Sequence, residues 1–358
     1  MPHGATRRAV LFSFAAAVAR AAKSRTFPSE VLRYADALTE FDIERLTRPE
    51  HSAWLPEPHC RAASRRSSFV VYASDRAGSP QLFRLDHRSG ASQCLTEAAA
   101  LETRVFTLLP GDRSLLYLDG PSLRLLALDS LKERELYRIR DGWSFIAGLA
   151  APQRPGSPVL ITEERDQVSE VIAVWPERRK PQIVLHSAGL VSQPVLSPTA
   201  SEFCCLRTNQ LHAGRLDGSG SHFIATAPGR ILQAFWRPDG GAVLYLLARE
   251  DGRTEIREAA RAGDSDTLIA PASRFAAFAP NADGSVFAGA VNSAAQPHIV
   301  LLLRSPRKEL TLCEHGASRP AEAAPAFSPD SQRLYFASDS PGKPCIFHVP
   351  LDRILERT

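Results

Sequence analysis

Length, composition and charge place the chain among soluble globular proteins. Its 358 residues are 44% hydrophobic and 23% charged, which excludes disordered, collagen-like and multi-span membrane proteins. The formal net charge is +4, and it falls to +1 without residues 1–22, because these hold Arg7, Arg8 and Arg20 but no acid. Nucleic-acid binding is not expected, because such proteins usually carry a pronounced basic footprint.

The first 22 residues have the pattern of a bacterial export signal. Arg7 and Arg8 precede the apolar run Ala9–Ala19, and alanines with the spacing of a cleavage site follow. The run is too short for a stable membrane anchor. The arginine pair also resembles a twin-arginine signal, which would imply export in a folded state. We therefore predict a signal peptide at residues 1–22, cleaved near residues 19–22, and a periplasmic or secreted mature protein with no integral membrane segment.

Six cysteines in an exported chain could form disulfides. Their spacing fits no zinc-binding pattern, and the adjacent Cys204 and Cys205 would point to opposite faces of a strand. We expect small core residues, and one or two disulfides remain the alternative. The six are Cys60, Cys94, Cys204, Cys205, Cys313 and Cys345.

Two segments precede the repeated part of the chain. Ser24–Asp42 is expected to be partly helical, because Phe27-Pro28-Ser29-Glu30 resembles a helix start. Phe41–Thr47 (FDIERLT) is a strand-like run that ends in Leu-Thr.

A hairpin pattern then recurs along the chain. Phe69–Asp86 (FVVYASDRAGSPQLFRLD) and Leu334–Asp352 (LYFASDSPGKPCIFHVPLD) each contain two apolar runs joined by a Gly/Pro turn. A period of about 40–50 residues with several strands per unit is typical of a β-propeller. We therefore predict an all-β, seven-bladed propeller over residues 23–358. Comparable runs between the two hairpins start near Leu115, Val159, Phe203, Val243 and Val286.

The last unit lacks a fourth strand, since the chain ends soon after Cys345–Pro350. Phe41–Thr47 is an unassigned strand with the ending expected of an outer strand. We predict that it pairs beside Cys345–Pro350, so that an N-terminal strand closes the ring and protects an open sheet edge.

Propeller ligands usually bind over the central channel, on the loops that lead into the inner strands and on those joining second to third strands. Arginines and a histidine converging there would suit a carboxylated ligand, because a guanidinium matches a carboxylate through two parallel hydrogen bonds. The alternative is that each arginine caps a turn or pairs with a neighbouring acid. The candidate ligand-binding residues are Arg76, Trp143, Gln193, Arg207, Arg230, Arg274, His315 and Arg319.

Standard catalytic signatures are missing from the sequence. It has no Gly-x-Ser-x-Gly elbow, no His-Glu-x-x-His pair, no phosphate-binding loop and no EF-hand loop. His315 is a weak catalytic candidate, and the catalytic residues are otherwise unknown.

Three stretches resemble the oligogalacturonate lyase family: Tyr34–Thr47, Phe69–Thr96 and the C-terminal order His315-Gly-Ala-Ser…Phe327-Ser-Pro-Asp…Ala337-Ser-Asp. The repeats also resemble, more loosely, Tol-type periplasmic propellers of the PD40/WD40-like class. The first resemblance implies a seven-bladed propeller that cleaves small pectin fragments by β-elimination. It also implies a histidine-rich site for a divalent metal such as manganese, a base histidine and an arginine.

The sequence departs from this family where the metal is held. The family has a His-Pro-His cluster preceded by a glutamine, whereas Ala321–Ala326 reads AEAAPA, and alanine side chains offer no ligand atom. Gln193–Pro198 and Gln210–His212 stand where His-Pro-x-x-Ser-Pro and Arg-hydrophobic-Trp stretches are found. We therefore expect no metal cofactor, and His315 is the clearest polar residue of the family that remains.

The leading hypothesis is an exported oligogalacturonate-lyase-like propeller that binds acidic pectin-derived oligosaccharides or another small anion. Whether it also cleaves them by β-elimination stays open, since the metal ligands are replaced. The alternative is a non-enzymatic Tol-type propeller that docks a periplasmic protein partner. A third reading is a metal-free lyase or hydrolase that uses His315 with a neighbouring arginine.

Overall fold

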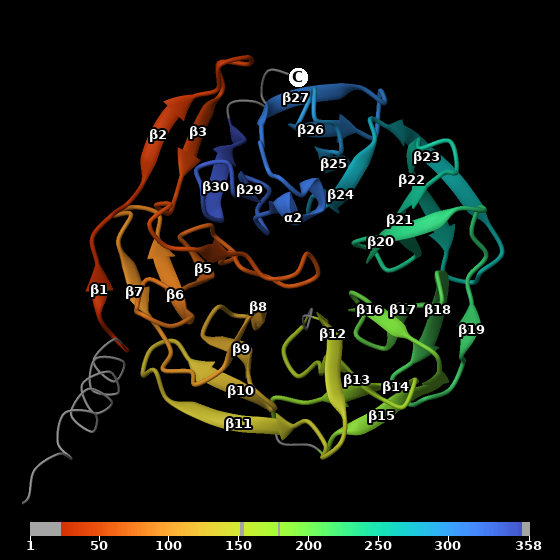
Figure 1. The fold of residues 1–358 in the computed structure, drawn as a ribbon. Helices are drawn as coiled ribbons and strands as arrows, with labels where there is room; N and C mark the ends of the chain where they lie inside the picture. The colour runs from red at the N-terminus through yellow and green to blue at the C-terminus, as the bar shows by residue number, and fades with distance from the viewer. Residues whose placement is uncertain (1–22, 151–153, 178–179, 353–358) are drawn as a thin grey trace, which may run out of the picture.

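A computed structural model of the protein describes residues 23–150, 154–177 and 180–352. Seven antiparallel sheets are arranged as blades around a central channel (Figure 1). The predicted all-β, seven-bladed propeller is thus confirmed. The predicted signal, residues 1–22, lies outside the described residues. Among those residues, no helix is long and apolar enough to cross a membrane.

Each blade is a meander whose consecutive strands pair antiparallel. Blade 1 has β4 (Ala53–Trp54), β5 (Phe69–Ser74), β6 (Gln81–Asp86) and β7 (Ser92–Cys94). Blade 2 has β8 (Leu101–Leu108), β9 (Ser114–Asp119), β10 (Ser122–Ala127) and β11 (Glu133–Arg138). Blade 3 has β12 (Ser144–Ala150), β13 (Val159–Arg165), β14 (Val168–Val174) and β15 (Gln182–Ala188). Blade 4 has β16 (Val191–Leu196), β17 (Glu202–Arg207), β18 (Gln210–Arg215) and β19 (His222–Phe223).

The remaining blades follow the same order. Blade 5 has β20 (Arg230–Trp236), β21 (Ala242–Ala248), β22 (Thr254–Ala260) and β23 (Asp266–Ala272). Blade 6 has β24 (Phe275–Pro280), β25 (Val286–Val291), β26 (His298–Leu303) and β27 (Glu309–Glu314). The short helix α2 (Pro320–Ala323) leads into blade 7, which has β28 (Ala326–Phe327), β29 (Arg333–Ser338) and β30 (Cys345–Pro350).

The hydrophobic core lies between neighbouring blades. All residues of β5 and of β25 are buried, which explains why these second strands read as continuous apolar runs rather than alternating ones. Gly289 in β25 shows how tight the packing is. A Cβ atom there would lie 2.2 Å from a ring carbon of Phe275, so the aromatic ring needs a glycine beneath it.

All six cysteines are buried free thiols. The expectation of small core residues is confirmed, and the alternative of one or two disulfides is not realised in the structure.

The N-terminal segment closes the ring, as predicted for Phe41–Thr47. Strand β3 (Asp42–Arg45) pairs antiparallel with β30, with Glu44 opposite His348. The chain adds two further outer strands that the sequence did not indicate. β2 (Leu32–Ala35) pairs with β3 in blade 7, and β1 (Thr26–Phe27) pairs with β7 in blade 1.

The partly helical expectation for Ser24–Asp42 was wrong. This segment forms β1, β2 and the start of β3, because the edges of blades 7 and 1 supply backbone partners that a local pattern cannot reveal. The ring of Phe27 packs against Phe83, with centroids 5.7 Å apart, and the Arg76 guanidinium lies 4.3 Å from its centroid. We call residues 24–47 the N-terminal strap.

Polar residues, of which His348 is fully buried, join the strap to blade 7 and blade 7 to blade 1. The fully buried His348 accepts a hydrogen bond at Nε2 from Arg333 (2.6 Å), and its Nδ1 lies 3.2 Å from Glu44 Oε2. His87 Nε2 lies 2.8 Å from the Tyr335 hydroxyl. Burial lowers the pKa of His348, although Glu44 opposes the shift. Burial, with help from the nearby Arg333 charge, lowers the pKa of His87 to about 3.

Acid is therefore expected to weaken the closure of the ring. Both histidines bind a proton less readily when folded than in the unfolded chain, so stability is lost as the pH falls below about 6.5. We expect His87→Gln to reduce the stability lost between about pH 7.5 and about pH 5 by roughly 1 kcal/mol, measured by denaturant unfolding at both pH values. The exposed His51→Gln is the control. Equal pH dependence in wild type and His87→Gln would contradict the prediction.

Candidate functional site

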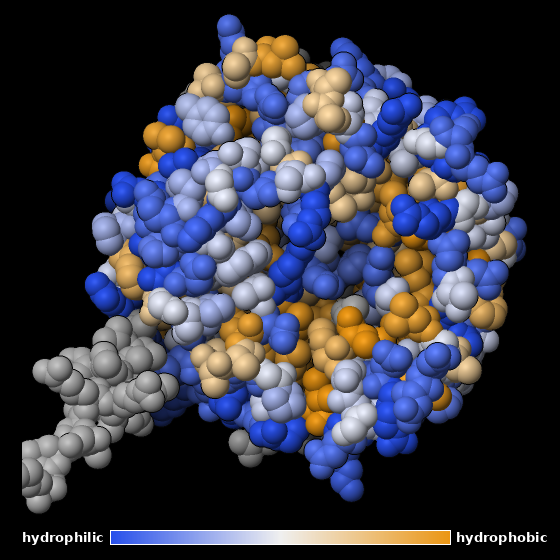
Figure 2. Space-filling view, viewed as in Figure 1, coloured by the Kyte–Doolittle hydropathy of each residue, from blue (hydrophilic) through white to orange (hydrophobic). Residues whose placement is uncertain are grey.

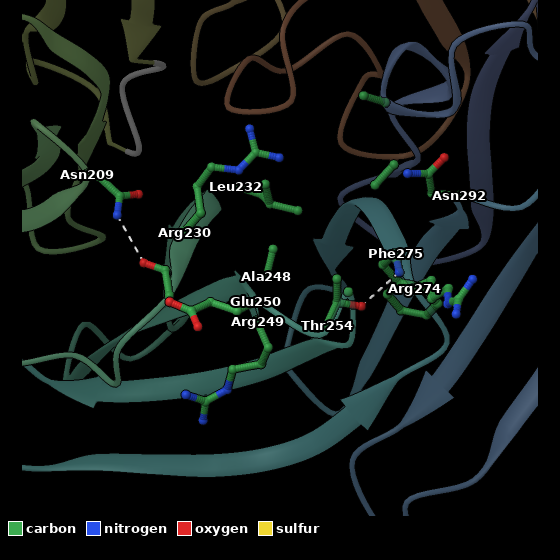
Figure 3. A pocket seen from close by; sticks show the side chains of 14 residues that line it. Asn209, Arg230, Leu232, Ala248, Arg249, Glu250, Thr254, Arg274, Phe275 and Asn292 are labelled. Atoms are coloured by element: carbon green, nitrogen blue, oxygen red, sulfur yellow. Dashed lines mark hydrogen bonds between the residues drawn. The ribbon is translucent and has the colours of Figure 1, made fainter.

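A cavity of about 1160 Å³ opens at the channel mouth over blades 4 to 6 (Figure 3). The loops that lead into the inner strands β20 and β24 form its walls, together with the turn between β21 and β22. We call this cavity the Arg230 pocket. Its polar lining residues are Asn209, Arg230, Arg249, Glu250, Thr254, Arg274 and Asn292.

The Arg230 pocket brings two predicted arginines to one cavity. Arg230 begins β20 and Arg274 immediately precedes β24, and both side chains are exposed. Within the described residues neither guanidinium makes a hydrogen bond or an ion pair. In Figure 3, Arg230 extends into the open space, whereas Arg274 points away from Arg230. The structure therefore offers two available guanidiniums on the wall rather than one preformed clamp.

The other charged residues of the pocket differ in availability. Arg249 donates hydrogen bonds of 2.8 Å to the Glu255 carboxylate and to the carbonyl of Pro228, so its charge is balanced. Glu250 is exposed and has no polar partner among the described residues. The net charge of the available groups is positive, which suits an anionic ligand.

Three other predicted residues serve contacts within the propeller. Arg76 is 7% exposed and pairs with Glu30 at 2.8 Å, so it anchors the N-terminal strap. Arg207 lies over the ring of Phe223, 5.2 Å from the centroid, on the outer side of blade 4. Gln193 donates from Nε2 to the Leu232 carbonyl at 2.9 Å and thereby joins blades 4 and 5.

His315 and Arg319 lie between blades 6 and 7. His315 is 1% exposed, its Nε2 donates to the Val291 carbonyl at 3.1 Å, and its Nδ1 accepts from Ala317 N at 3.0 Å. Burial lowers the pKa of this imidazole. Arg319 is exposed and pairs with Glu322 at 2.6 Å. Both ring nitrogens of His315 are thus engaged by the backbone, so a catalytic role would require breaking these contacts.

The residues at the mouth do not fit a divalent metal. Among the described residues, no group of three or more His, Cys, Asp or Glu side chains lies close enough to hold a metal ion. Ala323 and Ala324, in the stretch where the resemblance led us to expect a His-Pro-His cluster, are buried and apolar. Ala321 lines the Arg230 pocket, where the guanidiniums would repel a cation.

A second cavity, of about 530 Å³, opens at the mouth over blades 2 and 3. It contains the predicted Trp143, and we call it the Trp143 pocket. The guanidiniums of Arg140 and Arg165 lie 3.9 Å and 5.0 Å from centroids of the Trp143 ring.

Arg140 is fixed by two carboxylates that were not among the predicted site residues. Its Nε lies 2.6 Å from Glu163, which is fully buried, and its Nη2 lies 2.6 Å from Glu170. Glu163 and Glu170 are directly opposite in the β13–β14 hairpin, so their like charges require a cation between them. Glu163 and Glu170 are equally far from the hairpin turn in the sequence, and this spacing could have predicted that they lie opposite each other.

Arg140→Met is expected to destabilise the protein by about 2–4 kcal/mol, because it leaves the buried Glu163 without its cation. Denaturant unfolding measures the loss. Arg138→Met is the control, since Arg138 is exposed and its ion pair with Glu135 should contribute less than about 1 kcal/mol. Adding Glu163→Gln to Arg140→Met should restore part of the stability. Equal losses for the two arginine variants would contradict this role.

Comparisons with known proteins were made by sequence and by fold. No protein-family model matches the chain. The oligogalacturonide lyase of Pectobacterium atrosepticum is 20% identical over 377 residues, which cover 91% of this chain and 97% of that protein. An oligogalacturonate lyase solved in complex with manganese superposes with a TM-score of 0.84 at 20% identity, covering 94% of this chain and all of that one.

A further solved oligogalacturonate lyase, from Vibrio parahaemolyticus, superposes with a TM-score of 0.83 at 18% identity over 93% of this chain. It is covered along its full length. The predicted resemblance to oligogalacturonate lyases is confirmed, and the solved structures show that the fold is shared.

Proposed function

We propose that this chain is an exported propeller that binds an acidic, pectin-derived oligosaccharide at the Arg230 pocket without a metal ion. The main support for this proposal is that Arg230 and Arg274, on neighbouring blades, reach the channel mouth with no ion-pair partner among the described residues. The sugar carboxylates of such a ligand would supply the missing partners. Similarity to oligogalacturonate lyases along most of the chain supports the choice of ligand.

The lining of the Arg230 pocket favours binding over cleavage. β-Elimination of a galacturonate needs a base for the C5 proton and a means of neutralising the C6 carboxylate. The guanidiniums can meet the second need. Among the described residues, however, the pocket lining contains no histidine, and Glu250 is its one carboxylate. An exposed carboxylate is a weak base, so the barrier to carbanion formation stays high.

Export is supported by the pattern of residues 1–22 alone. An arginine pair, an apolar run and small residues at the end have the order of a signal peptide. In a bacterium the protein would meet acidic oligosaccharides in the periplasm or outside the cell.

The first test is the affinity for trigalacturonate, measured by calorimetry at low salt. We expect Arg230→Gln to weaken binding about tenfold, because one guanidinium–carboxylate contact is lost. Arg307→Gln is the charge-matched control, since Arg307 is an exposed arginine in the turn between β26 and β27. Unchanged affinity in Arg230→Gln, or an equal loss in Arg307→Gln, would show that binding does not use this pocket.

The second test follows the absorbance of the unsaturated product of β-elimination on digalacturonate and trigalacturonate. We expect no turnover above background, with or without added Mn²⁺, because the described part of the chain has no metal-ligating cluster at the mouth. Binding of trigalacturonate should likewise be unchanged by a chelator. Turnover that a chelator abolishes would overturn the proposal of a metal-free binder.

A further inference from the structure

The channel mouth holds two pockets on opposite sides. The Trp143 pocket is built on β8 and β12, whereas the Arg230 pocket is built on β20 and β24, across the ring (Figure 1). Figure 2 shows this face hollowed at the channel, with hydrophobic side chains gathered over β8 and β12. A single extended ligand lying over the channel would therefore contact both sides.

Arg104 is the feature that marks the Trp143 pocket as a binding site. β8 pairs with β9 at Leu101 and then again only from Phe106, so the residues between them are out of register. Arg104 lies in this irregular stretch, is half-buried, and lines both the Trp143 pocket and a small cavity beside Trp54. Its guanidinium makes no hydrogen bond or ion pair within the described part of the chain. A half-buried cation without a partner is costly, and a bound anion would remove that cost.

Two aromatic residues line the same pocket as this arginine. Trp143 and Phe145 come from the start of blade 3 and are each half-buried, so they present apolar surface to the cavity. Arg140 holds the Trp143 ring in place, and two carboxylates hold Arg140 in turn. Pockets with apolar walls and a few placed polar groups suit a ring-shaped ligand. Arg104 is the cation of this lining, which also includes the carboxylates of Glu57 and of the exposed Glu102.

We propose that the Trp143 pocket is a second subsite for the same acidic oligosaccharide. One uronate residue packs on Trp143 with its carboxylate on Arg104, while another uronate of the same chain occupies the Arg230 pocket. This inference rests on the proposed function and adds a length requirement to it. The preferred ligand is an acidic oligosaccharide long enough to cross the mouth, rather than a disaccharide.

The test compares digalacturonate with pentagalacturonate as ligands, by calorimetry on the mature full chain. We expect Arg104→Gln to weaken pentagalacturonate binding about tenfold and to change digalacturonate binding less than about twofold. Arg230→Gln should weaken the binding of both ligands. Arg113→Gln is the control, because Arg113 is an exposed arginine of the same blade in the turn between β8 and β9, at the opposite end of these strands. Without ligand, thermal unfolding of Arg104→Gln should occur at the wild-type temperature or above it, since Arg104 has no polar partner to lose among the described residues and its half-buried charge is costly.

The outcomes separate this inference from the proposed function. If the wild type binds neither ligand, the proposed function falls, and the second subsite falls with it. If the wild type binds both ligands with equal affinity, or if Arg104→Gln leaves pentagalacturonate binding unchanged, the second subsite is wrong while the Arg230 pocket stands. Preferential loss of pentagalacturonate binding in Arg104→Gln supports it.

Discussion

Closure of the ring by the N-terminal strap is the constraint on which the rest of the structure depends. The strap brings together residues at the two ends of the chain, as in the hydrogen bond from Ile346 N to the Thr47 hydroxyl. Loop-closure entropy grows with the logarithm of chain length, so the cost of this long-range contact rises by only about 0.6 kcal/mol for each doubling of the loop. Each blade buries its faces against two neighbours, and an open ring would expose the apolar faces of blades 1 and 7 to water. The positions of Arg104 and Arg230 across the mouth follow from that closure.

The arginines of this propeller fall into two groups: those paired with an acid of the protein and those left available to a ligand. Arg76 and Arg140 each reach an acid across a boundary between elements, Glu30 in the strap and Glu163 in the next blade. Such pairs hold the two elements together. Arg104 and Arg230 have no such acid within the described residues. The contrast matters more than the number of arginines, because a paired guanidinium has already given up the hydrogen bonds that a ligand carboxylate would take.

The sequence predicted the blades well because their signal is local. Buried second strands such as Phe69–Ser74 are continuous apolar runs, and turn residues separate them at a regular period. The N-terminal strap was predicted to be partly helical because Phe27-Pro28-Ser29-Glu30 is a good local helix start. In the structure Phe27 instead pairs with Ser92, far away in the sequence. Ion pairing of side chains also decided which of the predicted arginines are available at the site. Whether Arg76 or Arg230 is free depends on residues far away in the chain, and one sequence does not show them.

The proposed use of guanidiniums in place of a metal ion has a consequence for the type of function that the mouth would support. In the proposed function, positive charge at the ligand carboxylate comes from guanidiniums that are covalently part of the protein, so it does not depend on the supply of an ion. A guanidinium binds the carboxylate of the ground state about as well as that of a developing carbanion, unless a base removes the C5 proton at the same time. Interactions of equal strength in both states lower the dissociation constant without raising the rate. On the proposed function, a mouth that presents arginines, and whose pocket lining has no histidine among the described residues, is therefore better suited to holding an acidic oligosaccharide than to cutting it.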